Sequence, residues 1–299
     1  MISVIIPTYG SPVYLQESIE SVIGQTFQNW ELIIVDDNNS DTEARKATES
    51  LVEKFIYKDN RIKYIKHEKN MNGAVARNTG FTVAKGKYIS LLDSDDLYLP
   101  NRLQKCYDVM ENSDEKIAGV YTGCEFRKGN RKYNSFADVK SGNFLVETLA
   151  CRFMFCTGSN IFVRKEVVNE LNGFDVNFLR HQDYEFLVRM FLKYSLRAIP
   201  EILVVKNNEN FNLPNLDKLA AIKKQYLSKF QYVIDTLPNK DVKYIMHCNY
   251  INLAENAMAQ NKIKIANKFY NEASKFTHLS TREWFRRIAY LFYNLVKRY

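Results

Sequence analysis

The feature that most constrains this chain is a short apolar run that ends in three acids. The run and its acids form the sequence YISLLDSDD at residues 88–96. The apolar part is too short for a helix and is typical of a buried strand in a parallel sheet. Asp93, Asp95 and Asp96 follow at the carboxyl end of this strand, where open α/β sheets bind their ligands. The stretch therefore predicts either a cation-assisted phosphate-ester site or a solvated acidic turn.

The preceding residues predict a parallel sheet. Strand and helix patterns alternate, with strands at 2–7, 30–35 and 62–65 and helices at 13–25 and 41–58. This alternation is typical of right-handed crossovers between parallel strands. The second strand also ends in acids, Asp36 and Asp37. Because the carboxyl ends of parallel strands meet at one edge, we expect both acidic ends to face one crevice.

The glycine pattern excludes two common nucleotide-binding motifs. The chain contains no GxxxxGK[ST] sequence, and no GxGxxG follows the first strand. These observations argue against a P-loop and against a dinucleotide-binding domain. Gly73 and Gly80 instead bracket Arg77, and small residues around an arginine allow a pyrophosphate to approach. The alternative is an ordinary helix that packs its alanines inward and leaves Arg77 in solvent.

Composition and charge leave several partner classes open. The 299 residues are 46% hydrophobic and 25% charged, as in ordinary globular proteins. The net charge of +8 suits an anionic ligand, a nucleic acid or an acidic membrane surface. Five scattered cysteines without CxxC spacing predict neither a disulfide framework nor a zinc site, and favour a reducing cytoplasmic compartment. We expect no signal peptide and no membrane span, and hence a soluble or peripheral protein.

Four motifs occur in order and carry a family resemblance. They are IIPTYG at 5–10, QTFQNWELIIVDDNNSD at 25–41, NGAVARNTGFTVAKGKYISLLDSDD at 72–96 and NGFD at 172–175. Together they resemble the inverting family-2 glycosyltransferases, of the bacterial polysaccharide-assembly type. The resemblance implies an α/β fold of the GT-A type at residues 1–213, with a mainly parallel sheet flanked by helices. It is followed by an all-helical C-terminal appendage at 214–299.

The resemblance also implies roles for single residues. The nucleotide-binding positions are Pro7, Thr8, Tyr9, Asp37, Gly73, Arg77, Asp93 and Ser94. Asp37 corresponds to the acid that hydrogen-bonds the uracil ring, and Asp93-Ser94-Asp95 is similar to the DXD motif. In that motif Asp93 contacts the ribose or the metal, and Asp95 binds the divalent cofactor, Mn²⁺ or Mg²⁺. Asp96 is instead expected to cap the helix that begins near Pro100.

The expected catalytic base is Asp183. Relatives usually carry Glu-Asp at this place, whereas this chain has Gln182-Asp183. The resemblance therefore implies a base that is retained without its acidic neighbour, and loss of that charge is expected to lower its pKa. The alternative is that Asp183 only caps the helix that follows.

Three other segments are interpreted through the resemblance. Asn207 and Asn208 stand near a position where many relatives have a histidine, so no third protein ligand for the metal is predicted. Cys124 and Glu125 are expected to face the acceptor side of the crevice. Residues 158–160 are expected either to contact the sugar or acceptor, or to form a simple turn.

The C-terminal region is predicted to be helical. Four helices are expected, at 216–236, 242–260, 264–276 and 281–299. The last is basic and amphipathic, with Trp284 and Phe285 among its apolar residues. Two interpretations stay open for it: peripheral membrane contact through 281–299, or packing within its own domain or in a homodimer.

The sequence therefore predicts an inverting, metal-dependent hexosyl- or N-acetylhexosaminyltransferase. The expected partners are a nucleotide-sugar donor, of which a UDP-linked one is expected, and a glycan or lipid-linked acceptor. We expect the protein to act in the cytoplasm, at the inner face of the cell membrane. An inactive scaffold of the same fold is an alternative, because Gln182 replaces an acid. A nucleotidyltransferase is disfavoured because no glycine-rich signature with Lys or Arg follows the first strand. A nucleic-acid-binding protein is disfavoured because acids cluster at the expected site.

Overall fold

The chain divides into two compact units. The computed structural model describes residues 1–129, 131–207 and 215–296, with side chains through residue 288. We call residues 1–143 and 154–210 the sheet unit, and residues 144–153 and 211–299 the helical unit. The predicted boundary at 213/214 lies outside the described residues.

Residues 144–153 differ from the prediction, which includes them in the catalytic domain. They contain the short helix α5 (Leu145–Leu149) and cluster with the helical unit. Tyr226 Oη donates to the Thr148 carbonyl at 2.9 Å, and Asn249 Nδ2 donates to the Leu149 carbonyl at 3.0 Å. These hydrogen bonds from distant residues attach the segment to the helical unit, and local sequence carries no sign of them.

The sheet unit is built on a mixed sheet. Its strands are β1 (Ile2–Thr8), β2 (Trp30–Asp36), β3 (Ile62–Lys66), β4 (Tyr88–Leu91), β5 (Leu97–Tyr98), β6 (Ile117–Lys128), β7 (Arg131–Phe136), β8 (Phe162–Arg164) and β9 (Ser195–Asn207). The order is β3-β2-β1-β4-β8-β6-β9-β5, with β7 paired to β6. The first four strands are parallel, as their sequence predicts. The remaining strands add antiparallel pairs as well as the parallel pair β6–β9.

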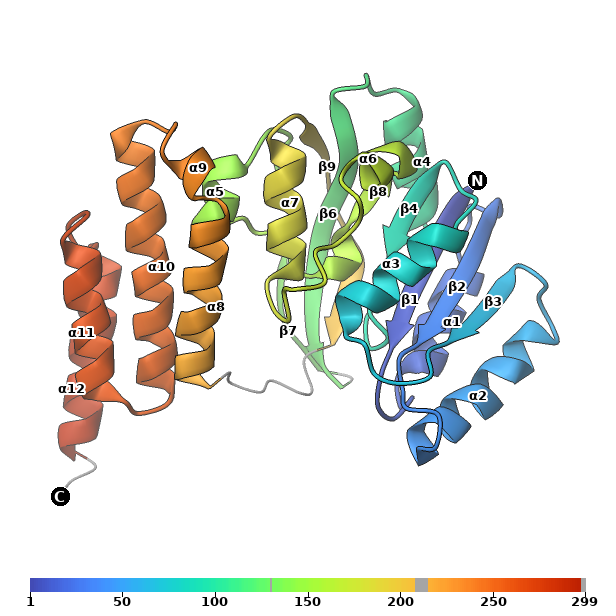
Figure 1. The fold of residues 1–299 in the computed structure, drawn as a ribbon, viewed down its shortest axis with the longest axis horizontal. Helices are drawn as coiled ribbons and strands as arrows, with labels where there is room; N and C mark the ends of the chain where they lie inside the picture. Colours follow the sequence, from blue (N-terminus) through green and yellow to red (C-terminus); the bar gives the residue numbers. More distant parts are fainter. Residues whose placement is uncertain (130, 208–214, 297–299) are drawn as a thin grey trace. The chain divides into compact units, whose positions relative to one another are not determined.

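Helices cover both faces of the sheet (Figure 1). They are α1 (Leu15–Ile23), α2 (Glu43–Ile56), α3 (Gly73–Val83), α4 (Arg102–Glu111), α6 (Lys165–Glu170) and α7 (Gln182–Phe191), with the 3₁₀ turn η1 (Gly158–Asn160). Ile19, Val52 and Leu103 from α1, α2 and α4 share one core with Val4. Helix α3 lies on the other face, close enough to β1 that a Cβ on Gly80 would lie 2.5 Å from Ile5 Cγ2.

The strand order creates a crevice at the ends of β1 and β4. Consecutive strands run from β1 to β2 and β3 in one direction, whereas β4 lies on the other side of β1. Open α/β sheets bind ligands at such a reversal of strand order. The segment after β1 begins with Tyr9, and the segment after β4 carries Asp93, Asp95 and Asp96. The fold thus brings the two segments to the same edge.

The second half of the sheet brings Lys206 to this edge. β9 pairs in parallel with β6 and antiparallel with β5, with Leu97 opposite Val205. Because β5 directly follows the acids, its pairing sets the end of β9 beside them. β6 extends over 117–128, and both β7 and β9 pair along its second half.

One disulfide is present, although the scattered cysteines predict no disulfide framework. Cys124 on β6 is bonded to Cys156 in the loop before η1. The two residues are 32 positions apart, so only the fold reveals that they are neighbours. Cys106, Cys151 and Cys248 are free thiols.

The helical unit contains longer helices around a separate core. They are α8 (Leu216–Lys229), α9 (Gln231–Ile234), α10 (Asn239–Ala259), α11 (Ile263–Ser274) and α12 (Thr281–Val296). The predicted helix at 216–236 is thus divided at Phe230 into α8 and α9. Ile251, Ala254 and Ala257 of α10 pack against Ala266 and Tyr270 of α11. Among the described residues, no helix combines the length and apolar character that a transmembrane span requires.

Candidate active site

Two adjoining cavities lie at the carboxyl edge of the sheet unit. The larger measures about 550 Å³ and the smaller about 280 Å³. Arg77, Asp93 and Lys206 line both cavities and mark the junction between them. The larger cavity contains every predicted nucleotide and metal residue: Pro7, Thr8, Tyr9, Asp37, Gly73, Arg77, Asp93, Ser94 and Asp95. Asp183 lines the smaller one.

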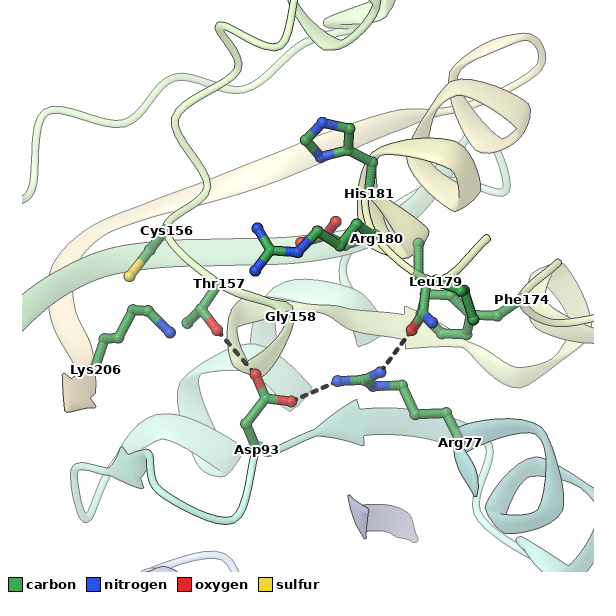
Figure 2. A pocket seen from close by; sticks show the side chains of 12 residues that line it. Arg77, Asp93, Cys156, Thr157, Gly158, Phe174, Leu179, Arg180, His181 and Lys206 are labelled. Atoms are coloured by element: carbon green, nitrogen blue, oxygen red, sulfur yellow. Dashed lines mark hydrogen bonds and ion pairs between the residues drawn. The ribbon is translucent and has the colours of Figure 1, made fainter. Parts of the chain in front are cut away.

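Arg77 and Asp93 form the central ion pair of the junction. Arg77 Nη2 lies 2.6 Å from Asp93 Oδ1, and Nη1 donates to Gln182 Oε1 at 3.1 Å (Figure 2). Burial alone would raise the pKa of Asp93, but the charges of Arg77 and Lys206 and the hydrogen bonds to the carboxylate lower it. Arg77 is therefore not solvated, contrary to the alternative from the sequence. A Cβ on Gly73 would lie 3.0 Å from Arg77 Nη1, so glycine leaves room for the guanidinium.

Asp95 and Asp96 have raised pKa values for the same main reason. Burial and the negative charge of Asp93 raise the pKa of Asp95. Burial raises the pKa of Asp96 to about 7, although Lys206 opposes the shift. Asp95 accepts no side-chain hydrogen bond from the part of the chain that the structure describes. Its charge is therefore the least compensated of the group.

Asp96 does not cap a helix, and that prediction is wrong. Helix α4 begins after Asn101, and Asp96 is fully buried. Its Oδ2 accepts from Ser159 Oγ at 2.6 Å and from Thr157 Oγ1 at 3.1 Å, and its Oδ1 accepts from the Asn207 N–H at 3.2 Å. Asp96 thus connects the loop before β8 and the end of β9 to the site.

Lys206 is the main residue of the site that the sequence does not predict. It lies near the end of β9 and points into the cavity toward Thr157 and Asp93 (Figure 2). Burial alone would lower the pKa of Lys206, but four surrounding carboxylates raise it: Asp96, Asp93, Asp95 and Asp183. Lys206 is the penultimate residue of β9, and no motif around it identifies it as a residue of the site.

Asp183 lies in the first turn of α7, facing the smaller cavity. His181 is the N-cap residue, but the Asp183 carboxylate accepts an N–H of the first turn, so the alternative of a capping role stays open beside that of the base. Within the described chain its carboxylate accepts one hydrogen bond, from the Tyr184 N–H at 2.9 Å. Burial raises the pKa of Asp183, although Arg77 opposes the shift. The prediction of a lowered pKa considered only the missing acidic neighbour, and burial outweighs it. A raised pKa suits a group that accepts a proton.

The acids after β2 are held by the protein itself. Asp36 pairs with Arg45 at 3.0 Å and accepts from Tyr64 Oη at 2.5 Å. Asp37 accepts from His67, Asn70 and the N–H groups of Met71 and Asn72, at 2.7–3.0 Å. The side chain therefore orders the loop at 70–72, which borders the larger cavity. A contact with a base ring stays a prediction.

Four predicted acceptor-side residues make other contacts. Glu125 pairs with Arg127 and Lys132, and Cys124 is bonded to Cys156. Asn160 is fully buried, where it accepts from Arg102 and donates to the Thr122 carbonyl. Ser159 is buried as well and donates to Asp96. Of these residues only Gly158, with its neighbours Cys156 and Thr157, lines a cavity.

The larger cavity has donors suited to a divalent cation. Mg²⁺ and Mn²⁺ prefer carboxylate oxygens and often use one or two carboxylates together with substrate phosphates. Asp95 and Asp93 supply such oxygens, and the uncompensated charge of Asp95 fits a cation. Within the described residues, no group of three His, Cys, Asp or Glu side chains is arranged to hold a metal. Substrate phosphates and water commonly supply the rest of such a shell.

Known proteins resemble this chain in sequence. Residues 3–171 match the model of glycosyl transferase family 2, and residues 88–292 match that of glycosyl transferase family group 2. An uncharacterized glycosyltransferase of Methanocaldococcus jannaschii is 33% identical over 246 residues, which cover 79% of each chain. The UDP-Glc:alpha-D-GlcNAc-diphosphoundecaprenol beta-1,3-glucosyltransferase WfgD of Escherichia coli is 34% identical over 136 residues, covering 46% of this chain and 50% of WfgD. The chain thus spans about half the length of some curated relatives that it matches.

A solved structure supports the fold. The mannosyltransferase PcManGT of Pyrobaculum calidifontis, in complex with GDP-Man and Mn²⁺, matches this chain with a TM-score of 0.59. The match covers 99% of this chain and 86% of PcManGT at 18% identity. This likeness confirms the predicted GT-A type of α/β fold with a helical C-terminal part.

Proposed function

The chain belongs to glycosyl transferase family 2, and from this we propose that it is an inverting, metal-assisted glycosyltransferase with a UDP-linked donor. The observation that carries the proposal is the junction at which Arg77, Asp93 and Lys206 line both cavities. A donor with its nucleoside in the larger cavity would set its diphosphate at this junction and its sugar toward Asp183. The name of WfgD, which contains UDP-Glc and a diphosphoundecaprenol-linked sugar, supports a UDP donor and a glycan or lipid-linked acceptor.

The larger cavity would hold the nucleoside. Pro7 and Thr8 end β1 and Tyr9 follows it along the wall of this cavity. Tyr9 is 65% exposed, so its ring is free to stack on a base. Asp37 lines the same wall and orders the loop at 70–72. Gly73 and Ser94 border the path toward the junction.

The junction would stabilise the leaving group. The bond between the anomeric carbon and the phosphate oxygen breaks with its electron pair on that oxygen, so negative charge develops on the nucleoside diphosphate. Arg77 and Lys206 are the protein cations in contact with both cavities, and they offset this charge. When bound, a divalent ion held by Asp95 and Asp93 supplies further positive charge to the diphosphate.

Asp183 would be the catalytic base. The acceptor hydroxyl oxygen attacks the anomeric carbon from the side opposite the leaving phosphate, which inverts the configuration at that carbon. The hydroxyl proton passes to the Asp183 carboxylate as the new bond forms. Arg77 connects this step to the leaving group, since it contacts both Asp93 and the neighbouring Gln182.

Nucleotide binding tests the proposal first. UDP, GDP, CDP, TDP and ADP are each added with and without Mn²⁺ or Mg²⁺, and the unfolding temperature is measured. A ligand that binds only the folded state raises its stability with the logarithm of its concentration over Kd. We expect a metal-dependent rise with UDP that exceeds the others. No rise with any nucleotide would contradict the proposal and favour the inactive scaffold.

Helix α12 supports a second part of the proposal, peripheral binding to the cytoplasmic face of a membrane. Two of its arginines contact its own unit: Arg286 pairs with Glu255, and Arg287 donates to Asn267 Oδ1 at 2.9 Å. Arg282 is exposed and forms no ion pair among the described residues. Trp284, Phe285 and Ile288 are 48%, 74% and 44% exposed. A helix docked through polar groups, with aromatics outward and arginines beside them, suits an anionic lipid interface. The predicted apolar residues beyond 288 lie outside the described side chains.

Co-sedimentation with phosphatidylglycerol vesicles tests this contact. The double variant Trp284→Ser and Phe285→Ser should lose vesicle binding, because it removes apolar area from the exposed face. Tyr57→Ser is the control, since Tyr57 is 93% exposed in the sheet unit. The contrary outcome is that the double variant binds vesicles as well as the unmodified protein does, while light scattering shows a dimer of the unmodified protein and a monomer of the variant. The exposed face of α12 would then bind a second copy of the chain rather than the membrane.

A further inference from the structure

A separate cavity lies within the helical unit. It measures about 540 Å³ and is lined by Arg152, by residues of α10 and by the turn and first residues of α12. Three arginines, two histidines and two glutamates contribute to its wall. None of these residues lines the cavities of the sheet unit, so the nucleotide site does not use them.

Both acids of this cavity already have partners. Glu255 forms an ion pair with Arg286. Glu283 Oε1 lies 3.2 Å from His247 Nε2, and its Oε2 accepts from the N–H and hydroxyl of Ser280 at 2.7 and 2.8 Å. These pairings fix the start of α12 and leave no carboxylate free to neutralise the remaining cations.

Two arginines stay without a carboxylate partner. Arg152 and Arg282 form no ion pair with any described residue. Arg152 is half-buried beside the Cys248 thiol, and Glu255, which acts on its charge, is already paired with Arg286. Arg282 lies one turn before Arg286 on the same wall and is exposed. With three arginines against two glutamates, the wall of the cavity carries an excess of positive charge.

We propose that this cavity binds the phosphate group of an anionic ligand. Guanidinium groups bind oxyanions through paired N–H donors, and they bind them more strongly when partly desolvated. A planar carboxylate is satisfied by one guanidinium, whereas the several oxygens of a tetrahedral phosphate can bridge two. Hydroxyl groups of Tyr244 and Thr277 on the same wall add donors. The volume exceeds that of a lone phosphate and leaves room for the group esterified to it.

Two sources can supply this phosphate, a soluble phosphate ester or a phospholipid headgroup. The first arm measures binding of pyrophosphate and glycerol 3-phosphate to the full chain by calorimetry, in EDTA and without nucleotide. The second arm measures co-sedimentation with phosphatidylglycerol vesicles, with phosphatidylcholine vesicles as reference. Binding in the first arm alone identifies a soluble ester. Binding in the second alone identifies a headgroup only if the arginine variant described next also loses it, because the exposed apolar face of α12 is itself proposed to bind these vesicles.

The double variant Arg152→Gln and Arg282→Gln assigns the binding to this cavity. We expect it to weaken the affinity at least about tenfold. The control is Lys264→Gln with Lys268→Gln, two exposed lysines of α11 outside the cavity, which removes the same charge and should leave affinity unchanged. If the arginine variant and the lysine control lose the same affinity, the effect is one of net charge and the proposal is overturned. Absence of binding by the unmodified protein in both arms would overturn it as well.

Arg282→Gln alone covers the case in which the double variant does not fold, because Arg282 is exposed and makes no ion pair among the described residues. It should weaken phosphate binding while the unfolding temperature stays unchanged, and full affinity in this variant would contradict the proposal. The nucleotide site is intact in all these proteins. UDP binding with Mn²⁺ therefore reports separately on the proposed transferase.

Discussion

The ends of β2 and β4 share one sequence pattern, an apolar run followed by acids, but differ in how the acids are compensated. After β2, Asp36 is buried against Arg45 and Tyr64. Asp37 is buried as well, with His67 and the loop at 70–72 around its carboxylate. Each carboxylate there has its own partners within the protein, so this strand end is already satisfied.

After β4 the balance is different. Asp93, Asp95 and Asp96 share the charge of Lys206 with Asp183 across the junction, and Arg77 acts on Asp93 and Asp183. Among the described residues, these four carboxylates thus have two partly buried cations, while Arg180 on the wall of the smaller cavity is exposed. The pKa of Asp96 is raised to about 7 by its burial, and the pKa of Asp95 is raised for the same first reason. This strand end has a deficit of positive charge.

The comparison teaches that a strand ending in acids predicts where carboxylates lie at the sheet edge. Whether these carboxylates stabilise the fold or bind a ligand depends on the cations and hydrogen-bond donors around them. A compensated pair stabilises the fold. A deficit of positive charge favours a cation, and a diphosphate can bring one with it. Four substitutions test whether the two ends differ in this way.

The largest effect is expected at Asp183, on the deficient side. Asp183→Asn removes the proposed proton acceptor without changing the shape of the side chain, so kcat should fall by about 10³-fold. UDP affinity in calorimetry should stay unchanged, because Asp183 lies outside the nucleotide cavity. Glu166→Gln, at an exposed acid of α6, is the control. Turnover close to that of the unmodified protein would exclude Asp183 as the base.

Arg45→Met tests the compensated side and should act on stability. It leaves the Asp36 carboxylate buried without its cation, and such losses destabilise by about 3–5 kcal/mol. Chemical denaturation measures the free energy of unfolding, and Lys46→Met is the control because Lys46 forms only an exposed pair with Glu43. If the two variants unfold at the same denaturant concentration, Asp36 is not the compensated acid described above.

Asp95→Ala tests the deficit directly. Removing the least compensated carboxylate should reduce metal-dependent UDP affinity by about 1–3 kcal/mol, since charge-assisted contacts have this size. UDP affinity in EDTA should not fall, because Asp95 binds the nucleotide only through the ion. Calorimetry with Mn²⁺ and with EDTA separates the two cases, with Glu115→Ala as the exposed-acid control. If the variant and the unmodified protein bind UDP with the same affinity in Mn²⁺, Asp95 is not a ligand of the metal.

The sequence predicts the local parts of this arrangement well. The strands β1 to β4 and helices α1 and α2 lie within about two residues of their predicted bounds, because apolar periodicity is a local signal. The family resemblance is confirmed, and the residues predicted for the nucleotide, the metal and the base all line the two cavities.

What the sequence does not predict depends on long-range pairing. Lys206 reaches the acids only because β9 pairs with β5, and the Asn207 N–H meets Asp96 across 111 residues. Arg45 is likewise indistinguishable in sequence from a solvated helix residue. The direction of the pKa shift of Asp183 follows from burial, which the pattern around it does not report. Charge compensation is therefore a property of the fold, and it is what separates the two strand ends.

The smallest expected effect concerns the pH dependence of stability in EDTA. The pKa of Asp96 is about 7 in the folded protein against an ordinary 3.8, so between these values the folded state holds a proton that the unfolded chain has lost. The free energy of unfolding therefore falls as pH rises through this window. Asp95 and Asp183 act in the same direction and Asp93 in the opposite one, so Asp96→Asn should make the fall shallower without removing it. The measurement is the unfolding free energy of both proteins at pH 5 and pH 7.5. Parallel profiles would mean that Asp96 is ionised throughout, and the charge deficit after β4 would then be smaller than its burial indicates.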